Sequence, residues 1–257
     1  MVDYTVLAER AFTLLQGHHQ NEPLVLPTVW DAWSARAMVD VGFNALSIGS
    51  HPLADSLGHA DGENMTLEQA LEGISRITSA VDVPITADLE SGYDTPAPEL
   101  IAGLLEAGAV GVNIEDTVHS RGSMRSPEEH AEYIWSLRQA AEAQRVHVVI
   151  NARTDVFKYP GDFEDPTAEV VRRLRLCTEA GADSVYPVRL PDVGTLKSIL
   201  AQITLPLNVT AHPIKGAVPE ELDLSQLAEL GVGRVTFGPL LQAALTDCFA
   251  DFTRAWQ

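Results

Sequence analysis

The sequence predicts an α/β protein in which residues 1–257 form one domain, a (β/α)8 barrel of the TIM-barrel class. Three observations support this. Eight short apolar runs recur along the chain, segments with helical periodicity separate them, and the length of 257 residues is typical of one closed barrel. No linker, low-complexity tract or break in composition divides the chain, so we expect a single domain.

The apolar runs are too short for helices and predict strands that are buried on both faces. They are LVLPT (24–28), ALSIG (45–49), PITAD (84–88), GVNIE (111–115), VHVVIN (146–151), SVYPV (184–188), PLNVT (206–210) and RVTFG (234–238). Strict alternation of strands and helices implies a parallel sheet, and eight repeats imply that this sheet closes into a barrel.

The segments between these strands carry helical periodicity, as in LEQALEGISRITSAV and TAEVVRRLRLCTEAG. A helix end, a glycine and a strand recur in this order, and we expect Gly42, Gly108, Gly181 and Gly231 to supply the left-handed residue that ends a helix. A further helix over residues 3–17 precedes the first strand, where it is expected to cover the bottom of the barrel.

The composition excludes several classes of partner. With 17 Lys and Arg against 36 Asp and Glu, the net charge of -19 repels phosphate backbones and anionic lipid, so we expect neither nucleic acid nor membrane as a partner. The two cysteines, Cys177 and Cys248, form no metal or disulfide motif and are expected to be buried thiols. The N-terminal stretch lacks the apolar core of a signal peptide, so we expect a cytoplasmic location.

Carboxylates dominate the segments that follow the second to fifth predicted strands. In barrels of this class the active site lies at the carboxyl ends of the strands, so these segments are the candidates for chemistry. The acidic residues are Asp61, Asp88, Glu90, Glu115 and Asp116.

Several of these carboxylates are expected to converge. Residues two apart on an extended chain point to the same side, so Glu90 can follow Asp88 into the barrel mouth, with Glu115 at the equivalent height on the next strand. A divalent cation would relieve their repulsion, and hard oxygen ligands suit Mg²⁺ or Mn²⁺ better than zinc. The alternative is that some of these acids cap helices or pair with Arg153 and Arg121.

Other polar groups lie near the same predicted edge. Arg153, after the fifth strand, suits bidentate binding of a carboxylate or an enolate oxygen, unless it forms a structural ion pair with Asp155 or Glu115. Backbone N–H groups at Gly49 and Ser50 could cradle a carboxylate, and His51 is a candidate substrate contact. The segment HSRGSMRS (119–126) is long enough to act as a lid, although it could also be a plain exposed loop.

Seven segments together carry a resemblance: WDAWSARAMVDVGFNAL, SLGHADGE, PITADLESGYD, AGAVGVNIEDT, INARTDVF, AGADSVYP and LGVGRVTFGP. Through them the chain resembles the isocitrate lyase/phosphoenolpyruvate mutase superfamily along nearly its whole length. The resemblance implies a barrel whose last helix is often swapped onto a partner in a homodimer or homotetramer. It also implies Mg²⁺ at Asp88, Glu90 and Glu115, with Asp61 nearby through water.

The resemblance further implies the roles of individual residues. Arg153 matches the arginine that binds the substrate's carboxylate and oxyanion. Ser50, with Gly49 and His51, matches the loop whose backbone holds a 2-oxo acid carboxylate, and Asn208 in the seventh strand is a further predicted substrate contact. The predicted catalytic set is Arg153, Glu115, Asp61 and Ser123.

Three departures from the superfamily's motifs bear on the reaction. Glu90 stands where the superfamily has Asp in DADxG. Ser123, in Arg121-Gly122-Ser123-Met124-Arg125, stands where the lyases carry the cysteine of K-[KR]-C-G-H, and a hydroxyl is a poorer proton donor and acceptor than a thiol. Thr117 and Arg121 replace the two lysines of the mutases' E-D-K-x-x-x-K-x-N, so neither branch fits.

The chemistry common to the superfamily remains. Cleavage of the C3–C4 bond of a 2-oxo acid leaves an enolate that the metal and Arg153 can stabilise, and a CO₂ leaving group needs no specialised acid. We therefore predict a Mg²⁺-dependent C–C lyase or decarboxylase for a small 2-oxo or 2-hydroxy dicarboxylate such as oxaloacetate. The alternatives are C–P chemistry on a phosphonate, weak isocitrate- or methylisocitrate-type cleavage, and non-catalytic binding of 2-oxo acids.

Overall fold

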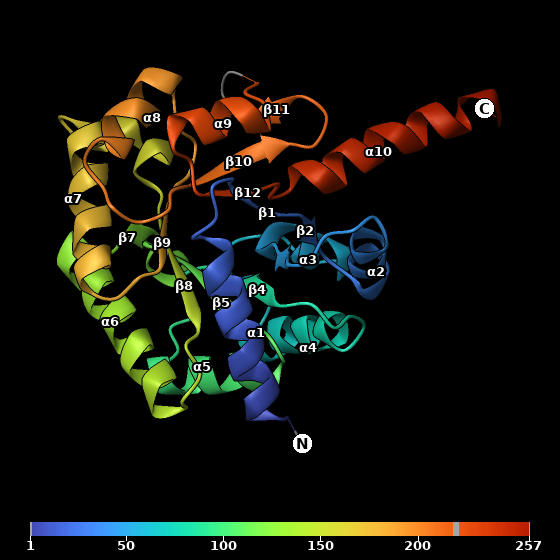
Figure 1. The fold of residues 1–257 in the computed structure, drawn as a ribbon, viewed down its shortest axis with the longest axis horizontal. Coiled ribbons are helices and arrows are strands. Elements are labelled where there is room, and N and C mark those ends of the chain that lie inside the picture. The colour runs from blue at the N-terminus through green and yellow to red at the C-terminus, as the bar shows by residue number, and fades with distance from the viewer. Residues whose placement is uncertain (1, 218–220, 257) are drawn as a thin grey trace.

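The computed structural model describes residues 2–217 and 221–256, and in this part of the chain parallel strands follow one another around a barrel (Figure 1). The predicted apolar runs each coincide with a barrel strand. The strands are β1 (Leu24–Leu26), β2 (Thr28–Val29), β3 (Leu46–Ile48), β4 (Ile85–Asp88), β5 (Gly111–Glu115), β8 (Val149–Thr154), β9 (Ser184–Pro187), β10 (Asn208–His212) and β12 (Arg234–Thr236).

The barrel closes through two features of the backbone. Strands β2-β3-β4-β5-β8-β9 form one sheet, and β1-β12-β10 belong to a second. Pro27, which has no N–H to donate, separates β1 from β2 within one extended segment, and that segment therefore belongs to both sheets. On the other side, a parallel bridge joins Val185 to Leu207, just before β10. The predicted barrel class is confirmed.

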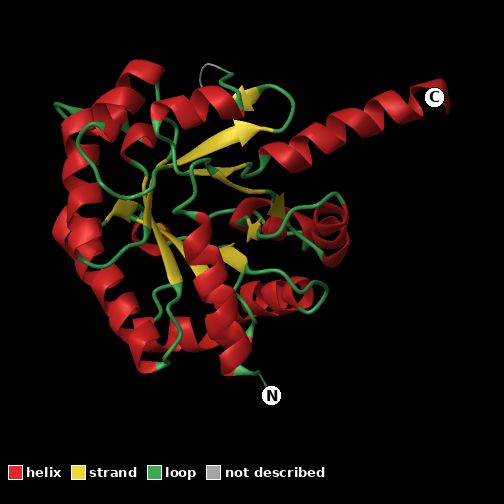
Figure 2. Ribbon diagram, viewed as in Figure 1, coloured by secondary structure: helices red, strands yellow, loops and turns green. Residues whose placement is uncertain are grey.

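Helices surround the strands (Figure 2). Several begin at a side chain that accepts a hydrogen bond from the first turn, as Asp31, Thr66, Ser126 and Asp223 do. The helices that follow barrel strands are α2 (Ala32–Asp40), α4 (Leu67–Thr78), α5 (Ala97–Glu106), α6 (Pro127–Ala143), α7 (Pro166–Glu179), α8 (Val193–Leu200), α9 (Leu224–Leu230) and α10 (Leu240–Thr253). The shorter elements are α3 (Ser50–Ser56), β6 (Thr117–Val118), η1 (His119–Arg121), β7 (Ser123–Met124), η2 (Val156–Lys158), η3 (Pro160–Asp162), β11 (Gly216–Ala217) and η4 (Arg254–Trp256).

The four glycines predicted to end helices have the left-handed conformation that this position requires. Their φ angles are +104° at Gly42, +84° at Gly108, +97° at Gly181 and +85° at Gly231. This repeated helix end returns the chain to the start of the next strand, so the same local turn recurs at the amino ends of these strands, on the face opposite their carboxyl ends.

The first helix, α1 (Tyr4–Gly17), covers the bottom of the barrel as predicted. Leu7, Ala11 and Leu14 of α1 are buried. A Cβ atom added at Gly111, the first residue of β5, would lie 2.8 Å from Leu14 Cδ2. The helix thus closes the amino ends of the strands and leaves the carboxyl ends open.

The last helix, α10, projects away from the barrel (Figures 1 and 2). Ala244 is its buried residue, and Cys248 is only partly buried, whereas Cys177 in α7 is buried as expected. Among the helices that the described residues form, none combines the length and the apolar character needed to cross a bilayer.

Candidate active site

A cavity of about 330 Å³ lies at the carboxyl ends of the barrel strands. Every barrel strand except β1 contributes to its wall, through Thr28, Ser47, Asp88, Asn113, Arg153, Tyr186, Asn208 and Thr236. Segments that follow strands form its rim, among them residues 49–52, Asp61, Lys158 and Arg189. A parallel barrel places all of these strand exits on one face, which is why residues so distant in sequence meet here.

Two of the predicted carboxylates, Asp61 and Asp88, line this cavity. Asp88 ends β4, and its Oδ1 accepts a hydrogen bond from Glu90 N at 3.1 Å. Ser50 Oγ donates to Asp61 Oδ1 at 3.3 Å, and His51 Nδ1 is 3.5 Å from Asp61 Oδ2. The loop after β3 therefore holds Asp61 at the mouth of the cavity.

Glu90 lies behind this pair, not beside it. Its φ of +50° is left-handed, so the alternation of an extended chain, from which its direction was inferred, does not apply after Asp88. Its Oε2 accepts from Glu63 N at 2.6 Å, and its Oε1 accepts from Tyr93 Oη at 2.9 Å. Burial, reinforced by the charges of Asp88 and Asp61, raises the pKa of Glu90 to about 7.

Arg153 is held by a buried network of carboxylates. Its Nη1 lies 2.6 Å from Glu115 Oε2 and 3.5 Å from Asp88 Oδ2, and its Nε lies 2.8 Å from Asp155 Oδ1. Both ion pairs that the sequence offered as alternatives to substrate binding therefore exist. Burial lowers the pKa of Arg153, but the neighbouring carboxylates outweigh that effect and hold it above its usual range. The guanidinium is fixed in orientation and still reaches the cavity.

His119 is a neighbour of the site that the sequence did not single out. Its Nε2 lies 2.7 Å from Glu115 Oε1 and 3.6 Å from Glu90 Oε2, and the hydrogen bond to Glu115 raises the pKa of His119. The residue belongs to η1, inside the segment predicted as a lid. The sequence contained one signal of this contact, a histidine four residues after a glutamate at the end of a strand. It did not show the turn that brings His119 back to Glu115.

The substrate-binding residues predicted from the sequence line the same cavity as Asp88. Gly49 begins α3 without a side-chain cap, and a Cβ there would lie 2.7 Å from Thr28 Cγ2, so only glycine fits. Asn208 is buried and donates from Nδ2 to Thr236 Oγ1 at 3.1 Å. The structure thus brings Gly49, Ser50, His51, Asp61, Asp88, Arg153 and Asn208 together.

Comparison with known proteins identifies the family. A family model described as phosphoenolpyruvate phosphomutase matches residues 14–256. The chain belongs to the phosphoenolpyruvate mutase family. Oxaloacetate decarboxylase 1 of Pseudomonas fluorescens is 31% identical over 216 residues, which cover 81% of this chain and 71% of that protein.

Solved structures agree with this assignment. A Burkholderia cenocepacia J2315 protein assigned as a phosphonomutase is 37% identical, with a TM-score of 0.87 over 96% of this chain and 99% of that one. At 24% identity, a 2,3-dimethylmalate lyase of the phosphoenolpyruvate mutase/isocitrate lyase superfamily shares the fold, with a TM-score of 0.82 over 94% and 85% of the two chains. The superfamily suspected from the sequence is confirmed, and the chain is an enzyme of its lyase type.

In this phosphoenolpyruvate mutase family member, Ser123 does not line the cavity that contains Asp88, unlike the predicted site residues Asp61 and Arg153. It is exposed in the β6–β7 hairpin and lines a separate cavity with Tyr159 and Phe163. Arg121, which replaces one mutase lysine, is also exposed. Thr117, which replaces the other, is buried and donates from Oγ1 to Asp155 Oδ2 at 2.9 Å. In this conformation the hairpin brings no acid or base of its own to the cavity that contains Asp88.

Asp116 has a structural role. It is fully buried, accepts from Thr154 Oγ1 at 2.6 Å and from Asp155 N at 2.9 Å, and pairs with Arg173 Nη1 at 2.9 Å. Asp116 therefore forms a structural ion pair, which was the alternative to metal binding, although its partner is Arg173 and not Arg153 or Arg121.

The donors at the mouth of the cavity fit a hard divalent cation. Among the described residues, the hydrogen-bond and ion-pair partners of the Asp61 and Asp88 side-chain oxygens lie at 3.1–3.5 Å, whereas those of Glu90 and Glu115 lie as close as 2.6 Å. Within residues 2–217 and 221–256, no three His, Cys, Asp or Glu side chains form a ready-made metal cage. Two carboxylates completed by water and substrate are a common arrangement for Mg²⁺.

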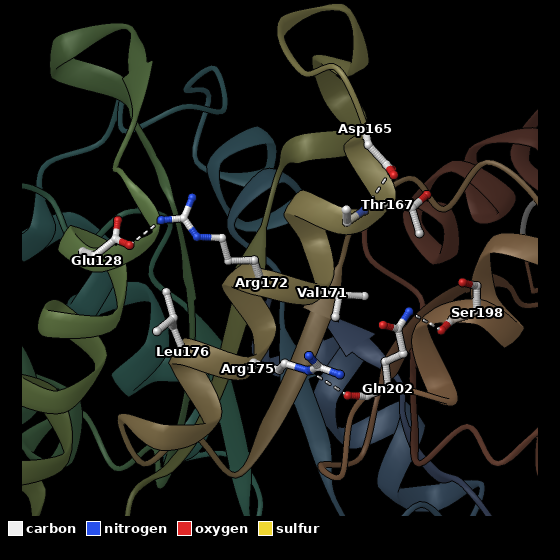
Figure 3. A pocket seen from close by; sticks show the side chains of 10 residues that line it. Glu128, Asp165, Thr167, Val171, Arg172, Arg175, Leu176, Ser198 and Gln202 are labelled. Atoms are coloured by element: carbon white, nitrogen blue, oxygen red, sulfur yellow. Dashed lines mark hydrogen bonds and ion pairs between the residues drawn. The ribbon is translucent and has the colours of Figure 1, made fainter.

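A second cavity, of about 630 Å³, lies outside the barrel along α7 and α8 (Figure 3). Its charged groups have partners: Arg172 pairs with Glu128, and Arg175 Nε donates to the Gln202 carbonyl oxygen at 3.1 Å. It contains none of the strand-end acids. The cavity at the strand ends is therefore the candidate active site.

Proposed function

We propose that this enzyme cleaves a carbon–carbon bond of a small 2-oxo or 2-hydroxy dicarboxylate such as oxaloacetate, with Mg²⁺ as its cofactor and Mn²⁺ as a substitute. The observation that carries the proposal is that one cavity at the strand ends contains Asp61, Asp88, Arg153 and the Gly49–Ser50–His51 loop. Cation-binding oxygens, a fixed guanidinium and free backbone donors are what a chelating 2-oxo acid requires.

Asp61 and Asp88 would hold the cation. Glu90 and Glu115 do not line the cavity and would contribute through water. When bound, the cation supplies Lewis-acid stabilisation of the charge that develops on the substrate's keto oxygen.

Arg153 would act on the same developing charge. Its ion pairs with Glu115 and Asp155 employ three of its N–H groups, and a guanidinium has five donors. The remaining donors can reach a substrate carboxylate or enolate oxygen at no cost in side-chain reorganisation. The backbone N–H groups at the start of α3 would hold the carboxylate next to the keto group.

Decarboxylation is compatible with a cavity to which the β6–β7 hairpin brings no acid or base. When the C3–C4 bond of oxaloacetate breaks, the electron pair forms the enolate of pyruvate, CO₂ departs, and one proton returns to C3. That proton can come from water, so the exposed position of Ser123 is no obstacle. The oxaloacetate decarboxylases among the relatives support this choice.

Phosphonate chemistry is the second candidate, because the 37% identical structure is assigned as a phosphonomutase. The buried Thr117 and the exposed Arg121, in place of the mutase lysines, weigh against it. We also propose a cytoplasmic location and a homodimer or homotetramer.

Parallel assays of the purified protein with MgCl₂ test these candidates. Oxaloacetate cleavage is followed as pyruvate above the spontaneous background, and isocitrate cleavage as glyoxylate. Phosphonopyruvate conversion is followed both as free phosphate, which C–P hydrolysis releases, and as phosphoenolpyruvate, which a mutase forms. We expect pyruvate from oxaloacetate to be the dominant product. Conversion of phosphonopyruvate into phosphate or phosphoenolpyruvate, without pyruvate formation from oxaloacetate, would replace this proposal by phosphonate chemistry. Binding without any turnover would indicate a 2-oxo acid binder.

A further inference from the structure

The interior of this barrel is polar well below its mouth. Barrels of this class are usually filled by branched apolar side chains. Here the cavity extends from Asp88, the last residue of β4, to Arg234, the first residue of β12. Between them, Asn151 Nδ2 donates to Asn113 Oδ1 at 2.8 Å, and Ser184 Oγ donates to Asn151 Oδ1 at 2.8 Å. The cavity therefore has a floor that polar side chains build.

Arg234 lies on that floor as a buried cation without a counter-charge. It is 1% exposed, and no carboxylate among the described residues lies within ion-pair distance of it. Among the described residues, its guanidinium makes one hydrogen bond, from Nη1 to Ser184 Oγ at 3.5 Å, and its Nε has no partner. By contrast, the buried Arg138, Arg153 and Arg173 each pair with a carboxylate.

The groups around Arg234 offset its charge only in part. Asp88 and Tyr186 raise the pKa of Arg234, but burial outweighs them. Its neighbour in the strand register, Asn208, also has a buried Oδ1 that has no hydrogen-bond partner among the described residues. On the α1 side, burial lowers the pKa of His18 to about 3, so that ring is neutral. Burial lowers the pKa of Arg234 to about 10, so the guanidinium stays protonated at neutral pH. A protonated buried group without a counter-ion is costly to fold, which points to a bound anion as its partner.

The charges in the cavity indicate what kind of anion this is. Arg153 and Lys158 are committed to Glu115 and Asp155. In the proposed function, the cation offsets Asp61 and Asp88. Two arginines of the cavity then have no carboxylate partner among the described residues: Arg189, which is exposed at the rim, and Arg234, which is buried at the far end. Of the two, Arg234 is the one whose charge water does not reach.

We propose that Arg234 binds the second carboxylate of the substrate and so selects two-ended dianions over monocarboxylates. This inference rests on the proposed function, since it assumes that the keto end of the substrate lies at Asp88. If the contacted carboxylate is the one lost as CO₂, the contact weakens as the bond breaks. Removing Arg234 then raises KM without lowering kcat.

The test compares wild type with Arg234→Met in the presence of MgCl₂. Binding of succinate, a dianion, and of pyruvate, a monocarboxylate, is measured by calorimetry, and oxaloacetate kinetics are recorded beside it. For Arg234→Met we expect succinate binding weaker by at least about tenfold, the KM for oxaloacetate raised by a similar factor, and pyruvate binding within about twofold of wild type. Arg76→Met, exposed on α4, controls for the loss of one positive charge.

Equal effects on succinate and pyruvate, or no effect on either, would overturn the role of Arg234 while leaving the proposed function intact. Failure of the wild type to bind pyruvate or turn over oxaloacetate would instead sink the proposed function, and this inference with it. If Arg234→Met does not fold, Arg234→Lys decides the question. It should weaken succinate binding and spare pyruvate binding, and a parallel loss of both would contradict the proposal.

Discussion

At the scale of single residues, the site depends on buried charges that fix one another. Arg153 contacts Glu115, Asp155 and, more distantly, Asp88, while Lys158 Nζ lies 2.6 Å from Asp155 Oδ2. Breaking a buried pair of this kind typically costs about 3–5 kcal/mol because the remaining charge is left unmatched. Substitutions here therefore test folding and catalysis together, and stability has to be measured beside turnover.

His18, behind the floor of the cavity, gives a residue-scale prediction about folding stability. Burial, reinforced by Arg234, lowers its pKa to about 3 in the folded protein, whereas an unfolded histidine titrates near its usual value of about 6.5. Between these values the unfolded chain binds the proton, so stability falls as pH drops below about 6.5. When the pH falls from 7 to 5, we expect the unfolding free energy of wild type to decrease by about 2 kcal/mol more than that of His18→Gln. Urea denaturation at the two pH values measures this difference.

The neighbouring residue provides a matched control. His19 is exposed, so His19→Gln should show the same loss of stability on acidification as wild type. An unchanged pH dependence in His18→Gln would contradict the assignment of a buried neutral ring at this position.

At the scale of elements, the turn after β4 contains several residues with a left-handed backbone conformation. Glu90, Tyr93 and Asp94 have φ values of 50°, 54° and 51°, all left-handed, and Gly92 has a φ of 99°. Non-glycine residues in this region carry a conformational cost of about 1–3 kcal/mol each and often mark functional sites. Here the turn is tied to Glu63, whose Oε1 accepts from Ser91 N at 3.1 Å and from Tyr93 N at 2.9 Å.

The β6–β7 hairpin combines a fixed base with an exposed tip. Arg125 anchors the base by donating from Nη1 to the Glu115 carbonyl oxygen at 3.2 Å and from Nη2 to that of Ser91 at 2.9 Å. The tip, which contains Ser120 and Ser123, is exposed. Whether residues 119–126 act as a lid stays a prediction, and Arg125 would confine such a movement to the tip. A catalytic role of Ser123 would require this tip to close over the cavity.

Substitution of Ser123 tests that role. Because its hydroxyl is a weak acid outside the cavity, we expect Ser123→Ala to retain kcat for oxaloacetate within about twofold. Ser120→Ala serves as the matched control on the same tip. A loss of about 100-fold or more that is specific to Ser123→Ala, in steady-state assays, would show that Ser123 supplies the proton after closure.

At the scale of the whole molecule, the sequence predicted the barrel because every strand carries the same local pattern. Short apolar runs and helix-ending glycines specify each β/α unit without reference to its neighbours. The direction of Glu90 could not be predicted, because a left-handed residue breaks strand alternation. Arg234 was also missed, because an arginine at the start of an apolar run gives no sign that it faces a polar interior. Whether all 257 residues fold as one domain stays a prediction.

The projecting helix α10 yields a prediction about assembly. Phe249, Phe252 and Trp256 are 59%, 73% and 90% exposed near its end. Apolar side chains grouped in this way are typical of a surface that another chain covers. We expect light scattering to show a homodimer or homotetramer for wild type and a smaller species for a Phe249→Ser/Phe252→Ser variant. Trp135→Ser, exposed on α6, is the control, and an unchanged mass in the double variant would rule out this contact.

The most direct test of the central claim is the Mg²⁺ dependence of oxaloacetate turnover in wild type and in Asp88→Asn. We expect pyruvate formation to require added Mg²⁺, to disappear with EDTA, and to fall at least about 100-fold in Asp88→Asn, whereas Glu72→Gln on α4 behaves as wild type. Turnover that survives EDTA, or an Asp88→Asn variant as active as wild type, would contradict a metal-assisted site at the strand ends.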